Sequence, residues 1–188
     1  MTAFEFFSVA LSFVLGLGLT RLLLGGLHTF RARRRQKPHW IPITWAVSIF
    51  IYQVQYWWAI FELNSLIDAW THGRFVTLLS LAMLLFVAGA LILPTSANDE
   101  QDALIDYFDD DGRWALLALT AYSALALWAN WYLFAAPPLS ATGLFVIAFS
   151  LISLTAFLTS DRRILGVLTV TYLLMAIGSY FALAPSEY

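Results

Sequence analysis

Five positive charges fall within seven residues, in the segment 31–37 (RARRRQK), between two long apolar stretches. A long apolar stretch flanked by such a cluster is typical of a membrane-spanning helix whose basic flank stays in the cytoplasm. Further apolar stretches with short polar breaks follow along the rest of the chain. The sequence therefore predicts an integral membrane protein with several spans.

Six stretches have the length of a transmembrane helix, which needs about 20 predominantly apolar residues to cross the hydrocarbon core. Prolines lie at or near most of the breaks between them. No connection is long enough to hold a soluble domain. We therefore expect one all-α membrane domain over residues 1–188, a six-helix bundle with spans at about 4–30, 41–62, 75–94, 114–134, 140–159 and 163–184.

The composition supports this class. Hydrophobic residues make up 61% of the 188 residues and charged residues 12%, where a soluble domain carries about 25%. The chain has no cysteine, which excludes disulfides, thiolate metal sites and cysteine nucleophiles. The first residues contain neither a basic leader nor a small-residue cleavage site, so we expect a retained helix and not a signal peptide.

The connections between the predicted spans alternate in positive charge. The first, third and fifth carry eight Lys and Arg residues, whereas the second and fourth carry only Arg74. The positive-inside rule then places the three basic connections in the cytoplasm and both termini on the non-cytoplasmic side. We expect this arrangement in a bacterial inner membrane, with the lipid bilayer as the immediate partner of the chain.

The third connection, 98–112, combines acidic residues with an apolar stripe. Asn98 followed by Gln101 resembles the capping box that begins a helix. Apolar residues then recur at helical spacing, at Leu104, Ile105 and Phe108. We expect a short amphipathic helix here, on the cytoplasmic membrane surface. The acidic run 109–111 lacks the alternating ligands of an EF-hand, so a solvated charge run is the simpler interpretation and a divalent-cation site the alternative.

Arg21 is the ionisable side chain that lies deepest within a predicted span. At about 1.5 Å per residue it lies about 15 Å from the basic segment, near the middle of the membrane. An ionisable group at that depth is costly and usually faces the bundle interior. Gly18 and Gly25 share its helical face, where small residues allow another backbone or a ligand to approach. Glu5 and Glu62 belong to the outer rim, so no carboxylate lies at its depth.

Polar residues on two other predicted helices are candidate partners for Arg21. Tyr52 and Gln55 lie on one face of the second helix, Tyr52 near the depth of Arg21 and Gln55 slightly closer to the outer rim. Ser123 and Asn130 share a face of the fourth helix. If these faces converge, the first, second and fourth helices enclose a polar seam.

Three interpretations of Arg21 remain open. It is a structural clamp that hydrogen-bonds Tyr52, Gln55 or helix carbonyls, a site for an anion or an anionic ligand group, or a side chain that snorkels to the cytoplasm. The aromatic residues near the span ends allow two interpretations. They form an aromatic belt at the headgroups or a cage that stacks on a ligand.

No catalytic or cofactor motif accompanies the seam. Only His28 approaches a span, whereas a b-type haem takes two axial histidines in the membrane. The His-Glu-x-x-His pattern of metalloproteases is absent, and no lysine lies in a span to activate a serine. We therefore expect no enzyme, no cofactor, no metal site and no nucleic-acid partner.

The leading hypothesis is a small membrane channel or carrier, assembled as a homo-oligomer because six short helices have little interior to enclose a pore. The seam forms its solute pathway, and Arg21 favours anionic solutes. The alternative is a non-catalytic membrane scaffold, sensor or accessory subunit of a larger membrane complex. In that case the seam holds the helices together, while the acidic helix and the basic segment dock a cytoplasmic partner.

Overall fold

The computed structural model describes residues 3–35, 37–66, 69–95 and 103–183, apart from the side chains of 3, 64–66 and 180–183. This part of the chain is helical with short connections, as the sequence predicts. The long helices are α1 (Ala3–Ala32), α2 (Trp40–Leu66), α3 (His72–Leu91), α5 (Trp114–Phe134), α6 (Ala141–Leu158) and α7 (Arg162–Leu183). A short α4 (Leu104–Tyr107) continues as a π-helical turn, Phe108–Gly112, which leads into α5.

Within the described residues, five helices are long and apolar enough to cross a membrane, namely α1, α3, α5, α6 and α7. This supports the predicted class of a membrane-embedded all-helical protein. α2 has 27 residues but falls outside that group. Its hydropathy is lower because one stretch of the helix carries polar and aromatic side chains, at Tyr52, Gln53, Gln55, Tyr56 and Glu62.

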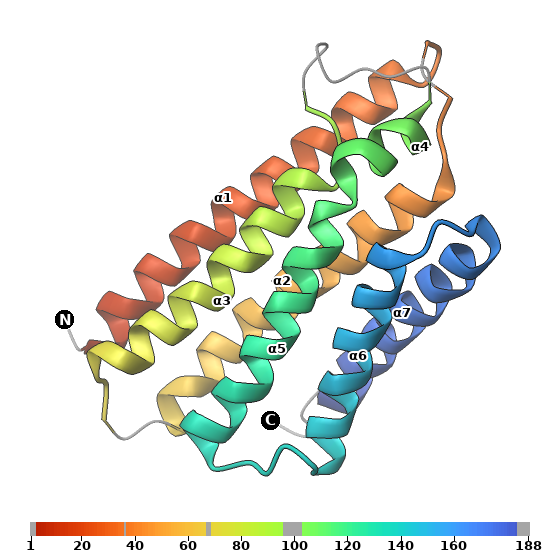
Figure 1. The fold of residues 1–188 in the computed structure, drawn as a ribbon. Helices are drawn as coiled ribbons and strands as arrows, with labels where there is room; N and C mark the ends of the chain where they lie inside the picture. The colour runs from red at the N-terminus through yellow and green to blue at the C-terminus, as the bar shows by residue number, and fades with distance from the viewer. Residues whose placement is uncertain (1–2, 36, 67–68, 96–102, 184–188) are drawn as a thin grey trace.

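The long helices close into a ring (Figure 1). α1 packs against α3, α3 against α5, α5 against α6, α6 against α7, and α7 against α2, which returns to α1. The start of α1 and the end of α7 lie at one end of the bundle, which we call the terminal end. α4 and the last turn of α1 lie at the other end, which we call the basic end because the arginines at 31 and 33–35 follow there.

Glycines set the close packing of α1 on α3. A Cβ atom added at Gly18 would lie 3.2 Å from Phe86 Cα, and one added at Gly25 would lie 2.9 Å from Leu93 Cβ. These two contacts also show that α1 and α3 run in the same direction, with Gly25 level with the first residues beyond α3. α1 therefore continues for about two turns past the basic end of α3.

The segment before α5 packs on the bundle itself. The described part of it begins at Ala103, so Asn98 and Gln101 of the expected capping box lie outside the described residues. Leu104 and Phe108 are fully buried, and Tyr107 Oη donates a hydrogen bond to the Leu91 carbonyl at 3.0 Å. The apolar stripe predicted for this segment thus contacts protein, and a membrane-surface position for α4 stays a prediction.

Candidate functional site

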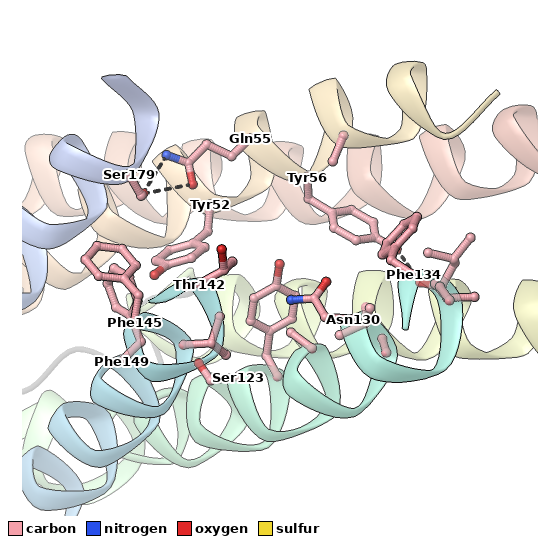
Figure 2. A pocket seen from close by; sticks show the side chains of 18 of the residues that line it. Tyr52, Gln55, Tyr56, Ser123, Asn130, Phe134, Thr142, Phe145, Phe149 and Ser179 are labelled. Atoms are coloured by element: carbon pink, nitrogen blue, oxygen red, sulfur yellow. Dashed lines mark hydrogen bonds between the residues drawn. The ribbon is translucent and has the colours of Figure 1, made fainter. Parts of the chain in front are cut away.

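A cavity of about 560 Å³ lies in the terminal half of the bundle, between α2 on one side and α5 and α6 on the other. Leu78 and Leu81 of α3 and Ser179 of α7 complete its wall. Its polar and aromatic lining residues come mainly from facing helices (Figure 2): Tyr52, Gln55, Tyr56, Glu62, Tyr122, Ser123, Asn130, Phe134, Thr142, Phe145, Phe149 and Ser179. This volume is in the range of pockets that hold small organic molecules.

The cavity is open toward the terminal end. Phe134 at the end of α5 and Thr142 at the start of α6 are exposed, and Glu62 near the end of α2 is half-buried. In contrast, Tyr52 and Phe149, which lie farther from that end, are buried. The first three residues therefore form the mouth of the pocket, and the last two form its floor.

A cluster of four aromatic side chains closes the floor. The ring of Tyr52 lies 5.3 Å from that of Phe149 and 5.8 Å from that of Tyr172, and Trp45 lies 4.6 Å from Tyr172 between ring centroids. Trp45 and Tyr172 are completely buried. The pocket is therefore separated from the basic end by packed aromatic rings.

One polar wall of the pocket is fixed by hydrogen bonds between α2 and α7. The Gln55 side-chain amide donates to the Ala176 carbonyl and to Ser179 Oγ, both at 3.1 Å. The next residue of α2 is Tyr56, whose Oη donates to the Leu78 carbonyl of α3 at 2.6 Å. These contacts hold α2 to its neighbours on both sides and orient its polar face toward the pocket.

Other polar atoms around the pocket have few partners among the described residues. Tyr52 Oη and Tyr172 Oη behind it are buried next to each other, and neither hydroxyl makes a hydrogen bond to any other described residue. The Asn130 side-chain amide, which Figure 2 shows on the opposite wall, also makes no hydrogen bond within the described part of the chain. Tyr52 and Asn130 both line the pocket, so their polar atoms are available to water or to a ligand there.

Five residues that the sequence analysis singled out meet at this pocket. Tyr52 and Gln55 of α2 face Ser123 and Asn130 of α5 across it, and Glu62 lies at its mouth. The helical spacing of these residues placed them on the correct faces. Glu62 Oε1 also accepts a hydrogen bond from the indole of the neighbouring Trp58 at 2.9 Å.

Arg21 does not join them, which corrects the predicted seam. Its side chain is exposed on α1, and α1 contributes no residue to the pocket wall. Gly18 and Gly25 are buried against α3, whereas Arg21 is rotated by about 60° from Gly18 and projects outward. Because α1 extends past α3, Arg21 lies close to the level where α3 ends, and its depth in a membrane stays a prediction.

Glu5, the second predicted rim residue, also lies outside the pocket. It is exposed in the first turns of α1. Its position at the terminal end agrees with the prediction, but α1 lies across the ring from α6, so Glu5 and the mouth of the pocket belong to different faces of the bundle.

α6 and α7 also contribute to the pocket, which the helical patterns in the sequence do not predict. Thr142, Phe145 and Phe149 recur at helical spacing along one face of α6, and Ser179 is the α7 residue that lines the pocket. Thr142 and Ser179 are polar residues near the ends of two apolar helices, and this is the one feature in the sequence that could have indicated their place in a polar pocket. The two phenylalanines could not be distinguished in the sequence from ordinary lipid-facing residues.

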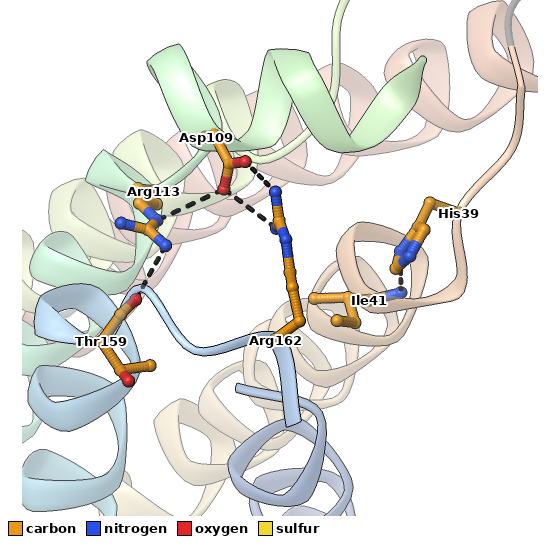
Figure 3. A network of polar contacts seen from close by, with 6 residues as sticks. All are labelled: His39, Ile41, Asp109, Arg113, Thr159 and Arg162. Carbon is orange, nitrogen blue, oxygen red and sulfur yellow. Dashed lines mark hydrogen bonds and ion pairs between the residues drawn. The ribbon is translucent and has the colours of Figure 1, made fainter. Parts of the chain in front are cut away.

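A separate polar network lies at the basic end (Figure 3). The Asp109 carboxylate of the π-helical turn accepts hydrogen bonds from Arg162 of α7 and pairs with Arg113 Nε at 3.6 Å. Arg113 Nη2 in turn donates to the Thr159 carbonyl at 2.8 Å. The network ties the start of α5 to the connection between α6 and α7. In the described residues the acidic run forms no group of three or more metal-ligating side chains.

His39 borders this network at the start of α2. Its Nδ1 accepts a hydrogen bond from the Ile41 backbone N–H at 3.3 Å. Burial lowers the pKa of His39, the positive charge of Arg162 lowers it further, and the carboxylate of Asp109 partly opposes both. The fold therefore favours the neutral imidazole.

Comparison with models of protein families, with curated proteins and with solved structures finds no match to this chain. Its function is therefore argued from the pocket and from the arrangement of the helices around it.

Proposed function

We propose that this protein is a small membrane carrier that binds an amphipathic solute in the pocket at the terminal end. The observation that supports this most is a pocket open at one end and closed at the other, whose wall carries the Tyr52 hydroxyl and the Asn130 side-chain amide. A bound solute would supply hydrogen bonds to these two groups. A channel needs a continuous polar path, and the aromatic cluster of Trp45, Tyr52, Phe149 and Tyr172 interrupts it.

α2 serves as a sixth span in this proposal. It packs against α1 on one side and α7 on the other, both of which are candidate spans. It begins at the basic end and finishes at the terminal end of the bundle. A helix that runs beside two spans from end to end crosses the same thickness of membrane.

The basic end is assigned to the cytoplasm. Most Lys and Arg residues lie in the connections at that end, and the positive-inside rule places such connections in the cytoplasm. Both chain termini and the pocket mouth then face the non-cytoplasmic side, and α4 lies at the cytoplasmic surface. The solute enters from outside the cytoplasm.

Anion selectivity is not part of this proposal. It rested on Arg21, and no Lys, Arg or His is among the described residues that line the pocket. A non-catalytic role and assembly as a homo-oligomer are retained as predictions.

The absence of cysteine allows a direct test with single cysteines and a membrane-impermeant thiol reagent. Ser123→Cys places a thiol in the pocket, and Ser48→Cys places one a turn beyond Tyr52 toward the basic end, where Ser48 is fully buried. Ser153→Cys, buried between α5 and α6, is the control for non-specific reaction.

A carrier predicts that Ser123→Cys reacts from the non-cytoplasmic side and Ser48→Cys from the cytoplasmic side, since the two openings alternate. Reaction of Ser123→Cys alone points to a sensor with a static pocket. Reaction of both positions from one side points to a channel. If Ser123→Cys reacts no faster than Ser153→Cys, the pocket is not accessible and the proposal fails.

A further inference from the structure

We infer that the solute of this pocket is an organic cation with an apolar body. The inference rests on the proposed function in one respect, the use of the pocket as a binding site. It adds the chemical class of the ligand, which follows from the charge and the aromatic surface of the pocket wall.

Among the described residues, the wall carries negative charge and no positive charge. Glu62 is the one charged residue among the described residues that line the pocket, and it is half-buried at the mouth. Arg74, the nearest basic residue along the chain, donates to the Ala69 carbonyl and does not line the pocket. A charge with reduced access to water interacts more strongly with an opposite charge than it does on an open surface.

The rest of the wall is aromatic. Tyr52, Tyr56 and Tyr122 face Phe145 and Phe149 around the same space. The ring planes of Tyr122 and Tyr52 meet at 74°, and those of Tyr122 and Tyr56 at 79°, with centroid distances of 5.9 and 6.4 Å. Ring faces carry partial negative charge and attract cations, most strongly where water is excluded.

These two properties act in the same direction. A cation gains from the carboxylate at the mouth and from the rings below it, and its apolar body replaces water along the alanine and leucine side chains of the wall. An anion of the same shape gains only the apolar contact and is repelled by Glu62. The pocket thus distinguishes ligands of equal size by the sign of their charge.

The test uses tetraphenylphosphonium and tetraphenylborate, which share size and shape and carry opposite charges. Purified Ser123→Cys protein in neutral detergent is labelled with the uncharged reagent N-ethylmaleimide, and each ion is titrated as a protecting agent. Labelling without either ion shows that the pocket is accessible, so a failure of the pocket itself is separated from a failure of the charge inference. We expect protection by tetraphenylphosphonium at concentrations about tenfold or more below those needed for tetraphenylborate.

Two matched pairs of variants show which residues are responsible for the protection by tetraphenylphosphonium. Glu62→Gln weakens protection by tetraphenylphosphonium about fivefold, whereas Glu5→Gln at the same end of the bundle leaves it unchanged. Phe145→Leu, which removes a ring from the wall, weakens it as well, whereas Phe61→Leu, on the exposed face of α2, does not. If Glu62→Gln does not fold, as judged by gel filtration, the phenylalanine pair decides.

Equal or better protection by tetraphenylborate overturns the inference. So does protection by tetraphenylphosphonium that survives both Glu62→Gln and Phe145→Leu, because the ion then binds elsewhere or only through its apolar surface. Absence of protection by either ion, with normal labelling, also overturns it and leaves the carrier proposal to the two-sided labelling of Ser123→Cys and Ser48→Cys.

Discussion

Two tyrosines one turn apart on α2 differ in their hydrogen-bonding partners. Tyr56 Oη donates to the Leu78 carbonyl at 2.6 Å and so ties α2 to α3. Tyr52 Oη lies at the floor of the pocket beside the Tyr172 hydroxyl and has no backbone partner among the described residues. The difference marks Tyr52 as the residue whose polar atom serves the pocket.

Phenylalanine substitutions at these positions measure that difference. Tyr56→Phe lowers the free energy of unfolding by about 1 kcal/mol, because it removes the hydrogen bond to the Leu78 carbonyl that links α2 to α3. Tyr52→Phe lowers the free energy of unfolding less, because the Tyr52 hydroxyl has no backbone partner among the described residues and contacts only the Tyr172 hydroxyl. Unfolding in mixed micelles with increasing dodecyl sulfate gives both values. An equal loss in the two variants would show that Tyr52 has a structural partner.

At the scale of the helix, small residues decide how closely two elements approach. α1 and α3 meet along Gly18 and Gly25 on one side and Gly89 on the other, where an added Cβ would come within 3.0 Å of the Gln53 amide. Gln53 of α2 is buried against the same two faces, and its side-chain amide donates to the Leu85 carbonyl of α3 at 3.2 Å. Packing of this kind leaves no room for a ligand, so the glycines of α1 are structural.

Alanine substitutions separate the packed glycines from the open ones. Gly25→Ala lowers the free energy of unfolding by about 1–3 kcal/mol, because the new methyl group must displace Leu93. Gly16→Ala, on a side of α1 with no atom within 4 Å of the added Cβ, is neutral or stabilising by up to about 1 kcal/mol. The same unfolding assay compares the two. A loss at Gly16 as large as that at Gly25 would place an additional contact on the open side of α1.

The stability of the protein depends on pH through His39, which lies at the basic end just before α2. Because its pKa in the folded protein is below the usual value of 6.5, the unfolded chain binds the proton more readily. The contribution of His39 to stability is therefore complete above about pH 6.5 and is lost as the pH falls through the lowered pKa. His39→Gln removes this part of the pH dependence, and His72→Gln at the other end is the control. Thermal unfolding between pH 7.5 and about 5 measures it, and identical profiles for wild type and His39→Gln would contradict it.

At the scale of the whole molecule, the two halves of the helical bundle differ in how their interior is filled. The terminal half contains the pocket, whereas the other half is filled by the aromatic cluster and by Leu104 and Phe108 of the segment before α5. The network of Asp109, Arg113 and Arg162 then ties the connections together at the basic end. A change between outward and inward openings would therefore have to rearrange the aromatic cluster.

Local sequence determined the helices and several of their faces. The ends of α5 coincide with the residues expected from hydropathy and punctuation, because length, apolar composition and breaks act within one segment. The spacing of Tyr52, Gln55 and Glu62 placed them on one face for the same reason, since a helix fixes the angle between nearby residues.

Only the tertiary structure decided which faces meet. The face of Gly18 and Gly25 was expected to line a seam, but it packs on α3, and Arg21 therefore points outward. The level of Arg21 relative to α3 also follows from this packing, because α3 ends about two turns before α1 does. Thr142 and Ser179 entered the pocket through the pairing of α6 and α7 with α5 and α2. Such pairings depend on residues far apart in the chain, and hydrogen bonding within a helix does not determine them.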